Sequence, residues 1–187
     1  MEMERGNRLR GLSIILVLSA LGGLNSIFVG YAGRLVSSLG LSFFAAPQLL
    51  AGFHVFWLVL AAMLVNMKGS ATTTGALKGL IEAALFSHIG IFSFIVSFTE
   101  GFFVDVLLAV FKRRNAVSVY LAGGFSSASN LLVIQLFFLP PLPTLVVASA
   151  YFASFLSGLV FGSYLATRVF RGLPPIFRTF GGTQKAT

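Results

Sequence analysis

Three acidic residues lie in long apolar stretches of this sequence, where a charged side chain is energetically costly. They are Glu82, Glu100 and Asp105. On insertion scales a charge at the centre of a membrane helix costs about 2.5–3.5 kcal/mol, so such a residue usually faces other helices and has a partner. A carboxylate in this position is suited to accept the cationic or amine-bearing part of a small molecule.

The neighbours of these acids offer them other roles. Glu82 stands four residues after Lys78, a spacing that places both on one helical face as a structural ion pair. Asp105 precedes the basic residues 112–114, among which a structural partner for it is expected. Glu82 and His88 are the candidate couple for a proton relay. Ligand binding, structural pairing and proton relay therefore all remain open.

Polar and aromatic side chains in the other apolar stretches add binding groups. His54 and Trp57 are three residues apart and share a helical face. An aromatic ring stacks on a flat ring or a cation, and amide or imidazole groups hydrogen-bond the edges of such a ring. We therefore expect a small-molecule pocket open to the outside, formed by Asn25, Tyr31, His54, Trp57, Glu82, His88, Glu100 and Asn130.

The composition indicates that a lipid bilayer surrounds these residues. Of the 187 residues, 57% are hydrophobic and 10% are charged, and the mean hydropathy is +0.94. A soluble domain usually has about 25% charged residues. There is no cysteine, which excludes disulfides and thiolate metal sites. The sequence predicts a single-domain, all-α integral membrane protein over residues 1–187, located in the cell membrane.

Six transmembrane helices account for the apolar segments. At about 20 residues per span, they fall at about 11–33, 45–67, 74–90, 91–111, 117–139 and 144–170. Basic residues concentrate on the cytoplasmic side of membrane proteins. With six spans, all but Arg34 of the 13 Lys and Arg residues lie on the side of the two termini, which predicts cytoplasmic termini. Charges so placed contact anionic lipids and argue against a nucleic-acid partner.

Small residues recur at every fourth position in the first and last spans. Such stripes let membrane helices approach one another closely. They predict either packing within this chain or a docking surface for another membrane subunit. The candidate docking residues are Gly22, Ser26 and Gly30 in the first span, and Ser154, Gly158 and Gly162 in the last.

Motifs of several enzyme classes are missing from the sequence. Residues 69–79 lack the lysine that directly follows the second glycine of a phosphate-binding loop, so the chain is not expected to be an ATPase. The H-E-x-x-H and G-x-S-x-G motifs and aspartate-rich metal loops are also absent. We therefore expect no enzyme activity, no cofactor and no metal site.

Four segments between about residue 52 and residue 130 carry a resemblance to a known family. They are GFHVFWLVLAAMLV, LIEAALFSHIG with Glu82, SFTEGFFVDVLLAVF with Asp105, and LAGGFSSASN. In this order they resemble the S components of energy-coupling factor (ECF) transporters, and most closely the thiamine/hydroxymethylpyrimidine S-component family. Glu82 and Asp105 match acids of that family, whereas Glu100 stands where the family has a neutral amide.

The resemblance implies that the chain captures a vitamin or its precursor from outside. It would then deliver this cargo through a membrane T component driven by two cytoplasmic ATPase subunits. Thiamine or hydroxymethylpyrimidine would pair with Glu82 and stack on Trp57 or Tyr31. Two other hypotheses stay open: a proton-coupled small-molecule permease that uses Glu82, His88 and Glu100, and a structural membrane subunit without a ligand.

Overall fold

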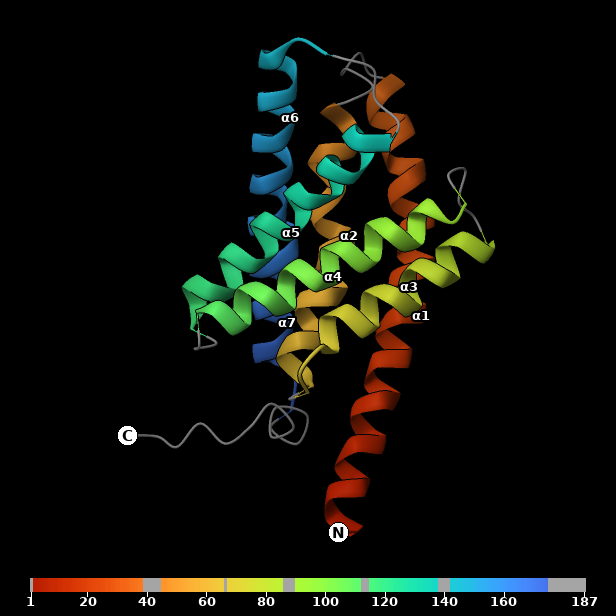
Figure 1. Cartoon of the computed structure of the whole chain (residues 1–187), viewed down its shortest axis with the longest axis vertical. Coiled ribbons are helices and arrows are strands. Elements are labelled where there is room, and N and C mark those ends of the chain that lie inside the picture. Colours follow the sequence, from red (N-terminus) through yellow and green to blue (C-terminus); the bar gives the residue numbers. More distant parts are fainter. Residues whose placement is uncertain are drawn as a thin grey trace.

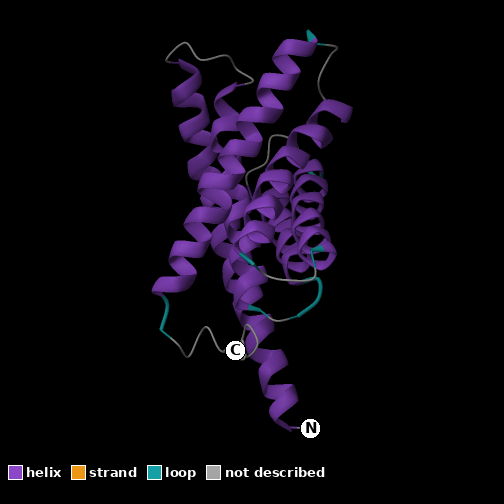
Figure 2. Ribbon diagram, turned by 90° about the vertical axis from the view of Figure 1, so that its left-hand side faces the viewer, coloured by secondary structure: helices purple, strands orange, loops and turns teal. Residues whose placement is uncertain are grey.

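The computed structural model of the chain describes residues 2–38, 45–65, 67–85, 90–111, 115–137 and 142–174. Every regular element in these ranges is a helix (Figure 2). They are α1 (Glu2–Ser38), α2 (Ala45–Leu64), α3 (Ser70–Leu85), α4 (Phe92–Val110) and α5 (Ala116–Phe137), followed by a helix in three consecutive parts, α6 (Thr144–Ser157), η1 (Gly158–Tyr164) and α7 (Leu165–Gly172). The all-α fold class expected from the sequence is confirmed for the described residues.

Helix α2 lies at the centre of the bundle and packs against each of the other described helices. Helices α3, α4 and α5 lie side by side and run obliquely across the steeper α1, α2 and α6 (Figure 1). In the same view the start of α1 and the end of α7 point to the same end of the bundle. This agrees with termini on one side of the membrane, although which side is cytoplasmic stays a prediction.

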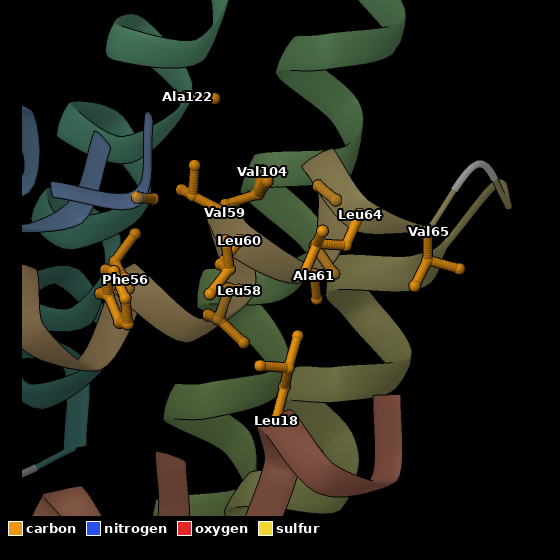
Figure 3. Packing of buried hydrophobic residues seen from close by; sticks show 14 of the residues in the cluster. Leu18, Phe56, Leu58, Val59, Leu60, Ala61, Leu64, Val65, Val104 and Ala122 are labelled. Carbon is orange, nitrogen blue, oxygen red and sulfur yellow. The ribbon is translucent and has the colours of Figure 1, made fainter. Parts of the chain in front are cut away.

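Apolar side chains fill the interior around α2 and also cover much of the outside. Val55 and Leu58 of α2 are completely buried, and Leu18, Val104 and Ala122 surround the same cluster from three other helices (Figure 3). On the outer surface, large side chains such as those of α1 and α6 remain exposed, among them Phe28, Leu35, Phe152 and Leu145. An apolar exterior of this extent fits a protein that is surrounded by lipid.

Among the described residues, five helical segments are long and apolar enough to cross a membrane, which makes this a multi-pass membrane protein. They are residues 8–38, 47–64, 92–110, 116–137 and 144–172. The expected third span, 74–90, differs: α3 has 16 residues, about 24 Å at 1.5 Å per residue, against a hydrocarbon core of about 30 Å. Lys78 and Glu82 also lower its hydropathy. A sixth crossing by α3 therefore stays a prediction.

The last helix widens into a π-helical segment, η1, where it meets α5. A Cβ atom added to Gly158 would lie 2.3 Å from the carbonyl oxygen of Gly123 and 2.6 Å from Cβ of Ser127. Gly52 makes a similar approach, because its added Cβ would lie 2.1 Å from the carbonyl oxygen of Ser157. Glycine is thus required for the close contacts that the last helix makes with α2 and α5.

We expect Gly158→Ala to destabilise the protein. The new methyl group collides with the α5 backbone, and overpacking of this kind costs about 1–3 kcal/mol, more than the roughly 1 kcal/mol that alanine gains in helix propensity. Gly30→Ala is the matched control, because nothing lies within 4 Å of a Cβ at that position. Thermal unfolding in detergent should give a lower midpoint for Gly158→Ala alone, and equal midpoints would contradict this packing.

Candidate functional site

Glu82 is the centre of a polar network between four helices. Its Oε1 atom lies 2.7 Å from Nζ of Lys78, one turn earlier on α3. The Lys78 ammonium also donates a hydrogen bond to Oγ of Ser97 on α4 (2.9 Å), and this hydroxyl donates to Oε2 of Glu82 (2.8 Å). The predicted Lys78–Glu82 pair is confirmed, and both carboxylate oxygens of Glu82 have partners.

Helices α1 and α2 complete this network with a serine and a histidine. The Ser26 hydroxyl donates a short hydrogen bond to Oε1 of Glu82 and lies 3.1 Å from Nδ1 of His54. A hydroxyl has one proton to donate. When Ser26 donates it to Glu82, rather than to the Gly22 carbonyl oxygen 3.0 Å away, the imidazole Nδ1–H donates to Ser26. The Nε2 atom of a neutral His54 is then an acceptor. His54 is half-buried, and its Nδ1 lies 3.8 Å from Oε1 of Glu82.

Trp57 lies beside this network with an indole N–H that has no hydrogen-bond partner among the described residues. A Cβ atom added to Gly22 would lie 3.1 Å from both Cγ of Trp57 and Cδ of Lys78, so the indole and the lysine stem adjoin the same point of α1. A buried donor without a partner is uncommon in proteins. Together, Glu82 and His54 supply acceptors, and Trp57 supplies a donor and an aromatic surface.

A second polar pair lies one turn farther along α4. Glu100 is completely buried, and its Oε1 accepts a hydrogen bond from Nδ2 of Asn130 on α5 (2.8 Å). Its Oε2 has no hydrogen-bond partner in the described part of the chain. Ser97 and Glu100 are three residues apart on α4. The Glu82 network and the Glu100–Asn130 pair therefore share one face of this helix.

The other predicted binding residues are placed differently. Asn25 faces α2, where its Nδ2 lies 3.4 Å from the carbonyl oxygen of Phe53. Tyr31 is 64% exposed, and the Arg34 guanidinium lies 4.7 Å from the centre of its ring. The structure therefore does not bring Tyr31 to Glu82. His88, with the predicted Glu82–His88 couple, lies outside the described residues.

Most of the predicted docking residues pack inside the bundle. Gly22 and Ser26 face Trp57 and Glu82, as described above. Ser154 is fully buried and donates to the carbonyl oxygen of Ser127, and Gly162 and Gly158 lie against α2 and α5 respectively. These five residues therefore hold helices of this chain together. Gly30 is exposed, and its docking role stays a prediction.

Asp105 accepts hydrogen bonds from the start of α3 and is not part of the Glu82 network. Its Oδ2 accepts hydrogen bonds from the Thr72 amide (2.7 Å) and the Thr72 hydroxyl (2.6 Å), and its Oδ1 lies 3.4 Å from the Ala71 amide. The first amides of a helix have no partner within the helix and favour a negative charge. Asp105 thus caps α3 from α4 and fixes the helix that presents Lys78 and Glu82.

Asp105→Ala should lower the free energy of unfolding by about 1–2 kcal/mol, the usual cost of losing a helix N-cap. Thr73→Ala is a suitable comparison, because its exposed hydroxyl donates locally, to the carbonyl oxygen of Gly69 in the turn just before α3. We expect the larger loss of thermal stability for Asp105→Ala. If the two variants melt at the same temperature, Asp105 does not act as a cap.

The family model "ABC-type cobalt transport system, permease component" matches residues 10–129, well over half of the chain. The chain belongs to this family. A solved structure described as "Crystal structure of an S-component of ECF transporter" is similar, with a TM-score of 0.76 at 16% identity over 86% of this chain and 82% of that chain. At this identity the likeness establishes the fold. No curated protein matches the sequence.

The permease family's name raises the question of a metal ion at this site. Within the described ranges, no three His, Asp or Glu side chains come together in a way that could hold one. Glu82 and His54 are close, but the Lys78 ammonium already occupies the carboxylate. The arrangement is better suited to a molecule that accepts and donates hydrogen bonds than to a bare divalent cation.

Proposed function

We propose that this chain is the substrate-capture subunit of an ECF-type importer, and that its cargo is thiamine or the hydroxymethylpyrimidine precursor. In such a system the chain binds its cargo from outside and delivers it through a membrane T component driven by two ATPase subunits. Membership in a transport permease family and the likeness of the fold to an ECF S component both support this proposal. The specific cargo rests on the resemblance of the sequence to the thiamine/hydroxymethylpyrimidine S-component family and on the chemistry of the site.

The observation that carries the proposal is the meeting of a carboxylate, an imidazole and an indole from two helices, α2 and α3. Glu82 is held between Ser26 and Ser97, with His54 beside it. The Trp57 ring adjoins the Lys78 stem at Gly22, and its indole N–H has no partner among the described residues. An aminopyrimidine has an exocyclic amine to donate to a carboxylate, ring nitrogens to accept from an N–H, and a flat face to stack on an aromatic ring. Thiamine adds a thiazolium cation, which aromatic rings attract.

Cobalt is the alternative cargo that the family description suggests. A divalent cation needs the carboxylate itself and several further N or O ligands, whereas Lys78 stands 2.7 Å from Glu82. An aminopyrimidine offers neutral N–H groups in place of the ammonium, and it needs no further carboxylate or imidazole ligands around it. The site therefore favours the organic cargo over the metal ion.

A thermal-shift scan of the purified protein in detergent tests the proposal. The compounds are thiamine, hydroxymethylpyrimidine, riboflavin, biotin and cobalt chloride. A ligand at 100 times its dissociation constant stabilises the native state by about 2.7 kcal/mol, and we expect this for one aminopyrimidine compound. A shift with another vitamin would keep the capture function and change the cargo. A shift with cobalt alone, or with none of them, would overturn the proposed cargo.

A further inference from the structure

Three ionisable side chains are buried in the described part of the chain, and their partners are unequally shared. Lys78 is completely buried, as is Glu100, and Glu82 is nearly so. The one ammonium pairs with Glu82, whose carboxylate also accepts from Ser26 and Ser97. Within the described ranges Glu100 has only Asn130, and its second oxygen is left without a hydrogen bond. One buried cation thus serves two buried carboxyl groups.

The position of Lys78 allows it to serve either group. Its ammonium bonds Ser97, which stands one turn before Glu100 on the same face of α4. A lysine carries its charge on a flexible four-carbon stem, and this stem passes Gly22, where α1 has no side chain.

We propose that Lys78 is a movable counter-ion, which pairs with Glu82 in the empty protein and transfers to Glu100 when a ligand occupies Glu82. The ligand's N–H groups replace the ammonium at Glu82, and the ammonium reaches Oε2 of Glu100. No covalent bond changes, and any proton that Glu100 holds in the empty protein leaves as the ammonium arrives. Hydrogen bonds and ion pairs are exchanged, and no buried ammonium is left without a carboxylate. The ligand-dependent half of this exchange rests on the proposed function.

The exchange makes Glu100 a specificity-determining residue that need not touch the ligand. A ligand must displace Lys78 to reach Glu82, and the displaced charge is accommodated only because Glu100 is there. Compounds that offer no donor group to Glu82 cannot release Lys78 and should bind poorly.

Stability measurements without any ligand test the exchange directly. Glu82→Gln removes the charge at the first position and so imitates a ligand that has neutralised it. In the native Glu82 background we expect Glu100→Gln to leave the unfolding midpoint unchanged or slightly raised. In the Glu82→Gln background Lys78 now pairs with Glu100, and we expect Glu100→Gln to lower the midpoint by about 3 °C or more, the shift that roughly 1 kcal/mol produces in a chain of this length.

The effect of Glu100→Gln thus changes from neutral to destabilising once Glu82 is replaced, and Lys78 must be the cause of this reversal. Adding Lys78→Met to the Glu82→Gln protein should abolish the loss caused by Glu100→Gln. Asp105→Asn is the matched control on α4, because its carboxylate caps α3 and its effect should be the same in both backgrounds. If Glu100→Gln has the same effect in the native background and in the Glu82→Gln background, Lys78 does not transfer and the proposal is overturned.

Ligand binding provides a second readout that separates this proposal from the proposed function. With a compound that the wild-type protein binds, Glu100→Gln should weaken affinity about tenfold in the presence of Lys78 and leave it unchanged in a Lys78→Met protein. Equal weakening in both would overturn the exchange even though capture is correct. A reversal in the stability series, together with no binding of any vitamin, would overturn the proposed function and support the exchange.

Discussion

Glu82→Gln should weaken binding of the aminopyrimidine compound at least tenfold, which is about 1.4 kcal/mol. The substitution keeps the size of the side chain but removes the negative charge that accepts the ligand's N–H groups. Hydrogen bonds to a charged group contribute about 1.5–3 kcal/mol, roughly twice as much as bonds between neutral groups. Because Ser26 and Ser97 already orient the carboxylate, little of this energy is spent on ordering it.

Titration calorimetry of the detergent-purified variant measures this loss. Glu4→Gln, which makes the same chemical change in the polar first residues of the sequence, should bind as the wild-type protein does. Size-exclusion chromatography and a thermal melt show whether the Glu82→Gln protein is folded. A folded variant with unchanged affinity would assign Glu82 to a purely structural pair with Lys78.

Lys78→Met should destabilise the empty protein by about 3–5 kcal/mol, the cost of removing one partner from a buried ion pair. Glu82 then keeps its two serine donors but loses its counter-ion, and no other Lys or Arg is buried in the described ranges. For a chain of this length the loss corresponds to an unfolding midpoint lower by roughly 10 °C. Lys78 is thus expected to be the residue with the largest effect on stability in the site.

The same variant should respond more strongly to ligand than the wild-type protein does. An aminopyrimidine supplies donor groups to a Glu82 that has lost its ammonium, so the ligand-induced shift of the unfolding midpoint should increase. Lys68→Met is the control, because Lys68 is exposed in the turn before α3 and surface changes usually stay within about 0.5 kcal/mol. Equal midpoints for the two variants would show that the Lys78–Glu82 pair contributes little.

Much of the fold could be predicted from the sequence, because hydropathy and helix length directly reflect the bilayer. The boundaries of α4, expected at 91–111 and observed at Phe92–Val110, agree closely. The Lys78–Glu82 pair also follows from local spacing, since i,i+4 residues meet on any helix. The short α3 could not be anticipated as easily. Its polar face is energetically tolerated in a membrane protein only because α1 and α4 pack over it, and this packing is not visible in the sequence.

The partners that join different helices were beyond prediction from one sequence. Ser97 has no distinctive neighbours, and its bridging position depends on how α3 packs against α4. Ser26 was predicted to dock a partner because its spacing with Gly22 and Gly30 matches a small-residue stripe, yet the rotation of α1 turns it toward Glu82. Asp105 likewise finds its partner at the start of another helix. Such contacts are set by helix rotation, which hydropathy does not determine.

The most direct test of the account is an equilibrium titration of the purified wild-type protein with thiamine, hydroxymethylpyrimidine and cobalt chloride under one buffer condition. We predict one aminopyrimidine compound bound per chain, with an affinity that an excess of cobalt does not change. Saturable binding of cobalt with no binding of either aminopyrimidine would contradict the account and would show that the buried Glu82 network serves a different cargo.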